Sequence, residues 1–211
     1  MKPAAIALFL VLALVSEAVL FEDRFDGKLA DGWAWVREDK ADWRLKDGGG
    51  LQIRATPGNL WEAENTARNL LLRPPPRDAK AFVVEVTVSH APETFGEQAG
   101  LFWYRDDDHY VKLTKEYYDG KVWVVLAAET GGKAQYKEAP CPAETVTLRL
   151  TVAGEKVEGQ FRPDGAKDWT TVGALPFKAA DGTRVGANAH HAPAGSPRWA
   201  TFRDFRIRAA Q

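Results

Sequence analysis

From about residue 20 to its end, the chain alternates short apolar runs of period two with Gly, Pro and Asp-Gly turn signals. Alternation of period two is typical of half-buried strands, whereas amphipathic helices repeat every 3.6 residues. The runs are rich in Val, Thr and aromatic residues, which favour strands. The pattern predicts strands at Leu20–Phe25, Trp33–Arg37, Trp43–Leu45, Leu51–Arg54, Asn69–Leu72, Phe82–Ser89, Gln98–Tyr104, Tyr110–Tyr117, Val122–Glu129, Ala134–Glu138, Thr145–Val152, Lys156–Phe161, Trp169–Val172, Arg184–Ala189 and Ala200–Arg208.

The turn signals indicate antiparallel pairing. Asp119-Gly120 between two apolar runs is the clearest hairpin, because Asp-Gly readily adopts the positive-φ turn that joins twisted strands. No window has the pattern of a three-turn amphipathic helix, and the prolines at 74–76 exclude one there. Many short antiparallel strands predict an all-β sandwich or barrel.

The N-terminus has the pattern of an export signal. Lys2 precedes about a dozen apolar residues, at 4–15, and small residues follow at Ser16 and Ala18. A membrane span needs roughly 20 apolar residues, so the run is too short for one. We therefore predict a signal peptide at 1–18, a single domain at 19–211, a secreted or periplasmic protein, and no stable membrane span after cleavage.

Composition excludes several classes of function. The 28 Lys and Arg against 29 Asp and Glu give a net charge of −1, which offers no basic field for nucleic acid. Cys141 is the only cysteine, so neither an intrachain disulfide nor a zinc site with several thiolate ligands can form. Eight tryptophans stand out in a chain of 211 residues. Aromatic side chains are therefore expected to contribute much of the apolar surface of the core or of a binding site.

One stretch resembles a known family. Residues 98–101 read Gln-Ala-Gly-Leu; an acidic turn at 106–108, then Tyr-Val-Lys-Leu at 110–113 and Glu116 follow. This order resembles concanavalin A-like jelly-roll domains, both those of the family named after a yeast regulator of enolase and the C-terminal domain of glycoside hydrolase family 43 xylosidases. The resemblance implies a jelly-roll sandwich of two antiparallel sheets. It implies little about function, since folds of this kind serve lectins, glucanases and accessory modules.

Strand alternation sorts the polar residues of the central strands onto one face. Val111 and Leu113 point one way, so Lys112 and Glu116 must point the other. We expect these two residues to converge with Glu85 and Gln98 on the floor of a concave groove. The aromatic residues expected to stack on a ligand or to edge the groove are Trp61, Tyr104, Tyr110 and Trp123. The alternative is a solvated cross-strand ladder of ion pairs among the charged residues.

Metal binding has two weak candidates. The resemblance implies calcium between Asp23 on the first strand and Asp204 on the last, where the ends of such sandwiches pair. The run Asp106 to His109 could also bind calcium, but it lacks the glycine and terminal glutamate of an EF-hand loop. An ordinary turn is the favoured interpretation there. We expect no cofactor other than this calcium.

The sequence favours an exported, non-catalytic module that binds carbohydrate through its concave sheet. Glucanases of the superfamily carry Glu-x-Asp-x-Glu on one strand, and this triplet is missing. A hydrolase with a cross-strand carboxylate pair, such as Glu85 with Glu116, is the first alternative. A structural or protein-interaction domain is the second. The identity of the glycan and the oligomeric state stay open.

Overall fold

The computed structural model describes residues 18–77 and 81–210. The expected signal peptide at 1–18 therefore falls almost wholly outside the described residues. The described residues contain a short 3-10 helix, η1 (Lys40–Asp42), and no helix that is long and apolar enough to cross a membrane. The strands are β1 (Val19–Asp23), β2 (Ala34–Val36), β3 (Trp43–Leu45), β4 (Leu51–Arg54), β5 (Leu70–Arg73), β6 (Ala81–Ser89), β7 (Gln98–Asp106), β8 (His109–Tyr118), β9 (Lys121–Thr130), β10 (Lys133–Pro140), β11 (Thr145–Ala153), β12 (Lys156–Pro163), β13 (Thr170–Pro176), β14 (Arg184–His190) and β15 (Trp199–Ala209).

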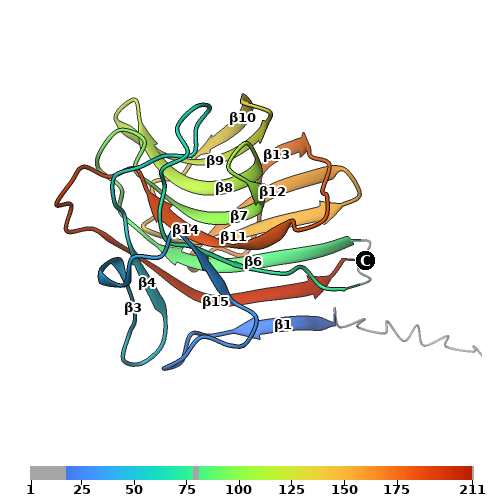
Figure 1. Ribbon diagram of the computed structural model, residues 1–211, viewed down its shortest axis with the longest axis horizontal. Coiled ribbons are helices and arrows are strands. Elements are labelled where there is room, and N and C mark those ends of the chain that lie inside the picture. Colours follow the sequence, from blue (N-terminus) through green and yellow to red (C-terminus); the bar gives the residue numbers. More distant parts are fainter. Residues whose placement is uncertain (1–17, 78–80, 211) are drawn as a thin grey trace, which may run out of the picture.

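The strands form two stacked antiparallel sheets, as Figure 1 shows. The first has the order β13-β12-β11-β6-β15-β4-β3, with β1 paired to β15. The second has the order β10-β9-β8-β7-β14-β5-β2. The chain crosses from one sheet to the other several times, for example between β6 in the first sheet and β7 in the second. The all-β jelly-roll expectation is confirmed, and each predicted strand overlaps an observed one.

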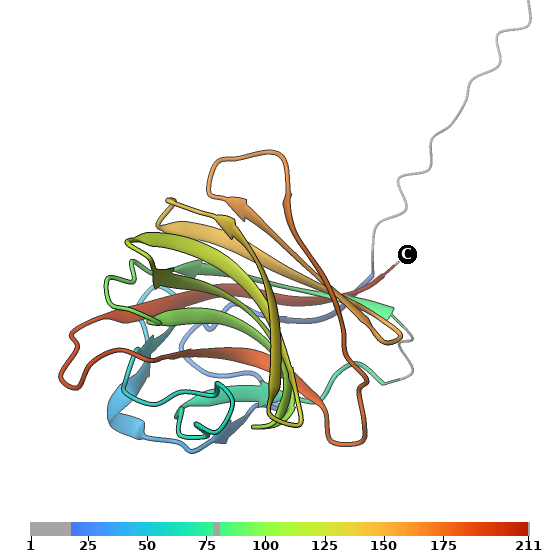
Figure 2. The same ribbon diagram turned by 90° about the horizontal axis from the view of Figure 1, so that it is seen from above.

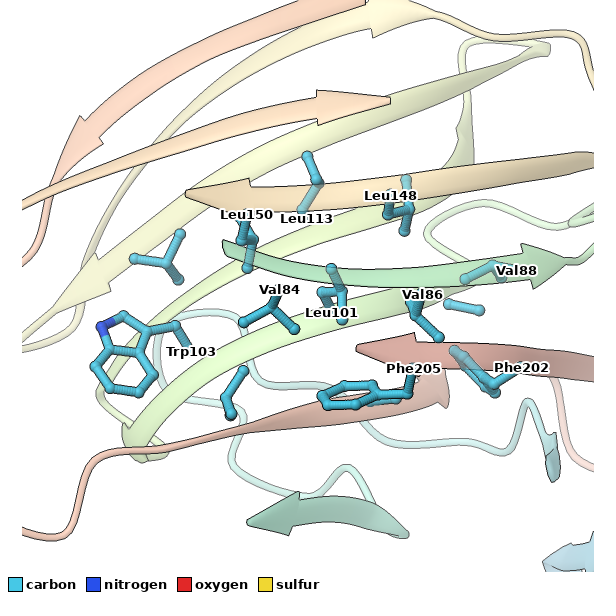
Figure 3. Packing of buried hydrophobic residues seen from close by; sticks show 14 of the residues in the cluster. Val84, Val86, Val88, Leu101, Trp103, Leu113, Leu148, Leu150, Phe202 and Phe205 are labelled. Atoms are coloured by element: carbon cyan, nitrogen blue, oxygen red, sulfur yellow. The ribbon is translucent and has the colours of Figure 1, made fainter. Parts of the chain in front are cut away.

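The main core fills the space between the sheets. Val84, Val86 and Val88 of β6 face Leu101 and Trp103 of β7, as alternation predicts (Figure 3). Trp33, Trp35 and Trp43 are partly buried and pack against the same core. At roughly 1.5–3 kcal/mol for each large apolar side chain, this burial is the main force that holds the chain together.

The outer face of the second sheet carries a smaller core of its own. The segment between β4 and β5, residues 55–69, folds back over this face, and Figure 2 shows β8 and β9 bending around it. Leu60 and Ala67 of the segment bury Phe102 of β7 and Tyr110 of β8. The segment therefore covers one half of the outer face and leaves the other half open.

Candidate functional site

A cleft of about 250 Å³ occupies the open half of that outer face. Its floor comes from β7, β8 and β9, and its rim from β10 and from three loops. The residues that line it are Asn59, Trp61, Phe95, Gly96, Gln98, Lys112, Glu116, Tyr118, Val125, Tyr136 and His191. The cleft is thus the place to which alternation assigned Gln98, Lys112 and Glu116.

Three polar side chains form the floor. The ammonium of Lys112 donates to Gln98 Oε1 at 2.6 Å and lies 3.7 Å from Glu116 Oε2. Lys112 is only 2% exposed. Glu116 Oε2 is also buried, and it accepts no hydrogen bond. The register pairs Gln98 directly with Glu116, which fixes all three groups on rigid strands. The floor therefore holds both a strong donor and an unfilled acceptor.

Aromatic rings surround the floor. The ring of Trp61 lies 5.4 Å from the Lys112 ammonium and meets Tyr136 edge to face at 6.3 Å. Phe95 and Tyr136 are 75% and 57% exposed, and they are the only exposed large aromatic residues in the described chain. Exposed apolar rings gathered round one cleft are typical of a binding surface.

Trp123 supports the rim without lining the cleft. It stacks on Tyr118 at 5.7 Å, and its indole N–H donates to the Tyr118 carbonyl. Tyr118 lines the cleft, and its hydroxyl donates to the carboxylate of Glu138. Trp123 therefore acts on the cleft through the position of Tyr118.

An ion pair holds the loop that carries Phe95. Glu97 is fully buried and accepts from Arg198 Nε at 2.7 Å and from the backbone and hydroxyl of Thr94. These hydrogen bonds lower the pKa of Glu97 against the opposing effect of its burial. His90 Nε2 lies 3.5 Å from the same carboxylate, and burial lowers the pKa of His90 to about 4.

The protein is expected to lose stability in mild acid because of His90. The folded state keeps this histidine neutral, whereas the unfolded chain takes up its proton below a pKa of about 6.5, so stability falls as the pH drops from 6.5 towards 4. This loss is about 2 kcal/mol between pH 7 and pH 5. The lowered pKa of Glu97 and the lowered pKa of buried His190 act in the same direction.

Urea unfolding at both pH values measures the loss. The His90→Gln variant keeps the polar side chain without its proton uptake, and its loss should be smaller by about 2 kcal/mol. Glu97, Lys115 and Arg198 face His90 and are unchanged in this variant. An equal loss in variant and wild type would contradict the assignment to His90.

Tyr104 and Tyr110 belong to the covered half of the face. Tyr110 is fully buried, and its hydroxyl donates to the carbonyl of Leu60 and lies 3.0 Å from Glu129 Oε2. Tyr104 is 4% exposed and donates to Asp107 at 2.8 Å. Burial is the largest cause that raises the pKa of each phenol. The two tyrosines hold the covering segment and the acidic turn, and neither lines the cleft.

The expectation that Glu85 shares the groove floor is wrong. Glu85 lies on β6, which belongs to the other sheet, and its carboxylate pairs with Arg149 and Arg208 on the outer face of that sheet. Alternation shows which residues of one strand share a face, but it does not show which strands share a sheet. A carboxylate pair of Glu85 and Glu116 therefore does not exist.

The residues proposed for calcium do not form a suitable donor set. Both oxygens of Asp23 accept hydrogen bonds from N–H groups, at 2.7 Å from Phe25, 2.9 Å from Ala30 and 2.8 Å from the indole of Trp33. These three N–H groups occupy three of the about four lone-pair positions of the Asp23 carboxylate, which leaves little for a cation. Asp204 is half-buried and pairs with Arg206 at 3.6 Å. No cluster of three metal-binding side chains occurs in the part of the chain that the structure describes.

The acidic run and two adjacent histidines, His190 and His191, have distinct places. Residues 106–109 form the tight turn between β7 and β8, in which Asp106 accepts from His109 and from the backbone of Asp108. His190 ends β14 fully buried, with its Nδ1 against Asn188. His191 has φ of 63° and turns to the rim of the cleft.

Besides Gly96 and Val125, five residues that line the cleft were not predicted from the sequence: Asn59, Phe95, Tyr118, Tyr136 and His191. Tyr118 and Tyr136 share the outward parity of Glu116 and could have been found from alternation on their strands. The other three lie on loops, where alternation carries no information. Their position depends on contacts such as the ion pair of Glu97 with Arg198.

Comparison with known proteins gives one family match. The family model described as the Beta xylosidase C-terminal Concanavalin A-like domain matches residues 22–208. This range spans nearly all of the described sandwich. No curated protein matches the sequence.

Solved structures share the fold. The GH43 protein BlXynB of Bacillus licheniformis is 22% identical with a TM-score of 0.79, over 90% of this chain and 39% of that one. A xylan beta-1,4-xylosidase of Bacillus halodurans C-125 is 24% identical with a TM-score of 0.75, over 89% and 38%. A functionally unknown protein of Saccharomyces cerevisiae is 23% identical with a TM-score of 0.66, over 85% and 97%. The chain thus spans about two fifths of the length of the two bacterial proteins.

Proposed function

The chain belongs to the family of β-xylosidase C-terminal concanavalin A-like domains, and from this premise we propose that it is a non-catalytic module that binds carbohydrate in the cleft of its second sheet. The family is described from carbohydrate-active enzymes, so a carbohydrate is the class of ligand to expect. The observation that carries the proposal is the build of the cleft, in which aromatic rings surround a polar floor.

That build matches the chemistry of sugars. A sugar ring presents hydroxyl groups along its edges and C–H groups on its faces. Trp61 and Tyr136 offer ring faces for the C–H groups, and Gln98, Lys112 and Glu116 offer hydrogen bonds for the hydroxyls. The strands hold the floor, so a ligand would meet groups that are already in place.

A hydrolase is the less supported alternative. Hydrolysis of a glycosidic bond requires two carboxyl groups that face one cavity about 5–9 Å apart. Among the described residues that line the cleft, Glu116 alone carries a carboxylate. The absence of a second carboxylate from this lining supports binding over catalysis. Release of reducing sugar from a bound polysaccharide would support the hydrolase alternative.

A purely structural role is also less supported. It would leave the charged residues closed into mutual ion pairs with no space above them. Lys112 and Glu116 do form an ion pair, at 3.7 Å, but the cleft lies above both. The open acceptor on Glu116 therefore supports a ligand-binding role.

Trp61→Ala is expected to weaken carbohydrate binding by roughly 30-fold, or about 2 kcal/mol, because it removes the largest ring at the cleft. The matched control is Trp169→Ala. Trp169 packs between Arg149 and Arg162, and Arg149 pairs with Glu85 on the outer face of the other sheet. Isothermal titration of both variants with the same ligand gives the comparison, and equal weakening in both would place the ligand elsewhere.

A glycan array and polysaccharide retention assays test the proposal as a whole. Wild-type protein should be retained by at least one class of glycan at millimolar ligand. No retention by any glycan would refute the proposal. We also place the protein outside the cytoplasm, on the basis of the signal pattern at 1–18. Detection of a mature chain that starts near Val19 in the exported fraction checks this placement.

A further inference from the structure

The floor of the cleft has hydrogen-bonding capacity that no protein group fills. The Lys112 ammonium carries three N–H donors, of which one donates to Gln98 at 2.6 Å. Its 3.7 Å separation from Glu116 Oε2 is longer than a hydrogen bond. Glu116 Oε2 is buried and accepts nothing. A donor with N–H groups to spare thus stands beside an acceptor of opposite charge that has no hydrogen-bond partner.

A hydroxyl group matches the chemistry of both atoms. It can donate its hydrogen to Glu116 Oε2 and accept from Lys112 Nζ at the same time. A carboxylate has no hydrogen to donate, so it would satisfy Lys112 but stand against the negative charge of Glu116. An amine would satisfy Glu116 but stand against Lys112. Of these groups, a neutral hydroxyl alone matches both atoms.

The charges around the cleft also disfavour an anionic ligand. Glu138 does not line the cleft, but it adds a carboxylate next to Tyr118, from whose hydroxyl it accepts. Apart from Lys112, no Lys or Arg is among the described residues that line the cleft. An anionic ligand would therefore find one ammonium beside one carboxylate in the cleft, with a further carboxylate just outside the lining, in a partly enclosed site where like charges repel strongly.

We propose that the cleft selects neutral sugars over uronic acids, with one sugar hydroxyl bridging Lys112 Nζ and Glu116 Oε2. This inference rests on the proposed function and specifies its ligand class. Glu116 is the residue that sets the selectivity, since its charge rejects a carboxylate. Lys112 contributes to the affinity for both kinds of sugar.

Matched pairs of methyl glycosides test the selectivity. Each pair has the same ring configuration and differs only in a hydroxymethyl or a carboxylate at C6, for the gluco, galacto and manno series. NMR titration of the Trp61 indole signal measures both members. Wild-type protein should bind the neutral member of at least one pair more than about tenfold tighter, a difference of roughly 1.4 kcal/mol.

The Glu116→Gln variant tests the assigned cause. The amide keeps the size of the side chain and removes its charge, so the preference for the neutral member should fall severalfold. The matched control is Glu158→Gln on β12 of the other sheet, where the charge of a carboxylate is removed without any effect on the cleft. Circular dichroism confirms that both variants are folded.

The outcomes separate the two proposals. Equal or tighter binding of the uronate overturns the neutral-sugar inference and leaves carbohydrate binding standing. An unchanged preference in Glu116→Gln overturns the role of Glu116. Retention by a polysaccharide without binding of any neutral glycoside also overturns the inference, because the floor would not be the recognition element. No retention by any glycan refutes the proposed function itself.

Discussion

Lys115→Met is expected to lower the free energy of unfolding by about 3 kcal/mol. Lys115 lies on β8 next to the cleft floor, but its side chain points inward between the sheets and is 1% exposed. Its ammonium donates to the backbone carbonyls of His90, Ala143 and Glu144. Methionine fills the same space and leaves two of these carbonyls without a partner, since Glu144 also accepts from the amide of His90. Each buried carbonyl without a partner costs about 1–3 kcal/mol.

Urea unfolding at pH 7 measures this loss. Burial lowers the pKa of Lys115 to about 8, so the ammonium is still mostly charged under these conditions. The matched control is Lys121→Met on exposed Lys121 at the start of β9, which should change stability by less than about 0.5 kcal/mol. If both substitutions cost the same, the three carbonyls do not depend on Lys115.

Gly186→Ala is expected to destabilise the fold by about 3 kcal/mol or more. A Cβ at Gly186 would lie 1.8 Å from the carbonyl oxygen of Leu71 on the neighbouring strand β5. Gly100 on β7 has the same relation to Leu113 on β8, at 2.1 Å. Backbone atoms cannot yield as a flexible side chain can, so the two strands would have to separate.

Thermal unfolding of Gly186→Ala should show the loss as a lower midpoint or as failure to fold. Gly27→Ala is the control, because a Cβ there meets no atom within 4 Å and costs only the strain of its φ of 73°. That strain is about 1 kcal/mol. An equal loss in the two variants would show that the close approach of β14 to β5 is not required.

The strands could be predicted because their signals are local. Alternation in 82–88 and the Asp119-Gly120 turn depend only on neighbouring residues, and both appear in the structure as expected. The inward position of Trp103 follows from its parity with Leu101 in the same way. The positions of the strands and the face on which each side chain lies therefore needed no information on long-range contacts, whereas the jelly-roll sandwich itself followed from the family resemblance.

The errors concern long-range contacts. Glu85 has the expected outward parity, but its strand crosses to the other sheet. Tyr104 and Tyr110 face the expected side, but the segment 55–69 folds back and buries them. Phe95 reaches the cleft through a loop that Arg198, more than a hundred positions away along the chain, holds in place. No periodicity in the sequence encodes such contacts.

The pairing of Glu97 with Arg198 links the two loops that bear Phe95 and His191. Loops joined in this way open together, so amide hydrogen exchange at residues 94–97 and at Ser196 and Arg198 should give one common free energy of opening. A rim that is ordered before the ligand arrives loses little conformational entropy on binding. The association rate should then be governed by diffusion into the cleft and not by rearrangement of its loops.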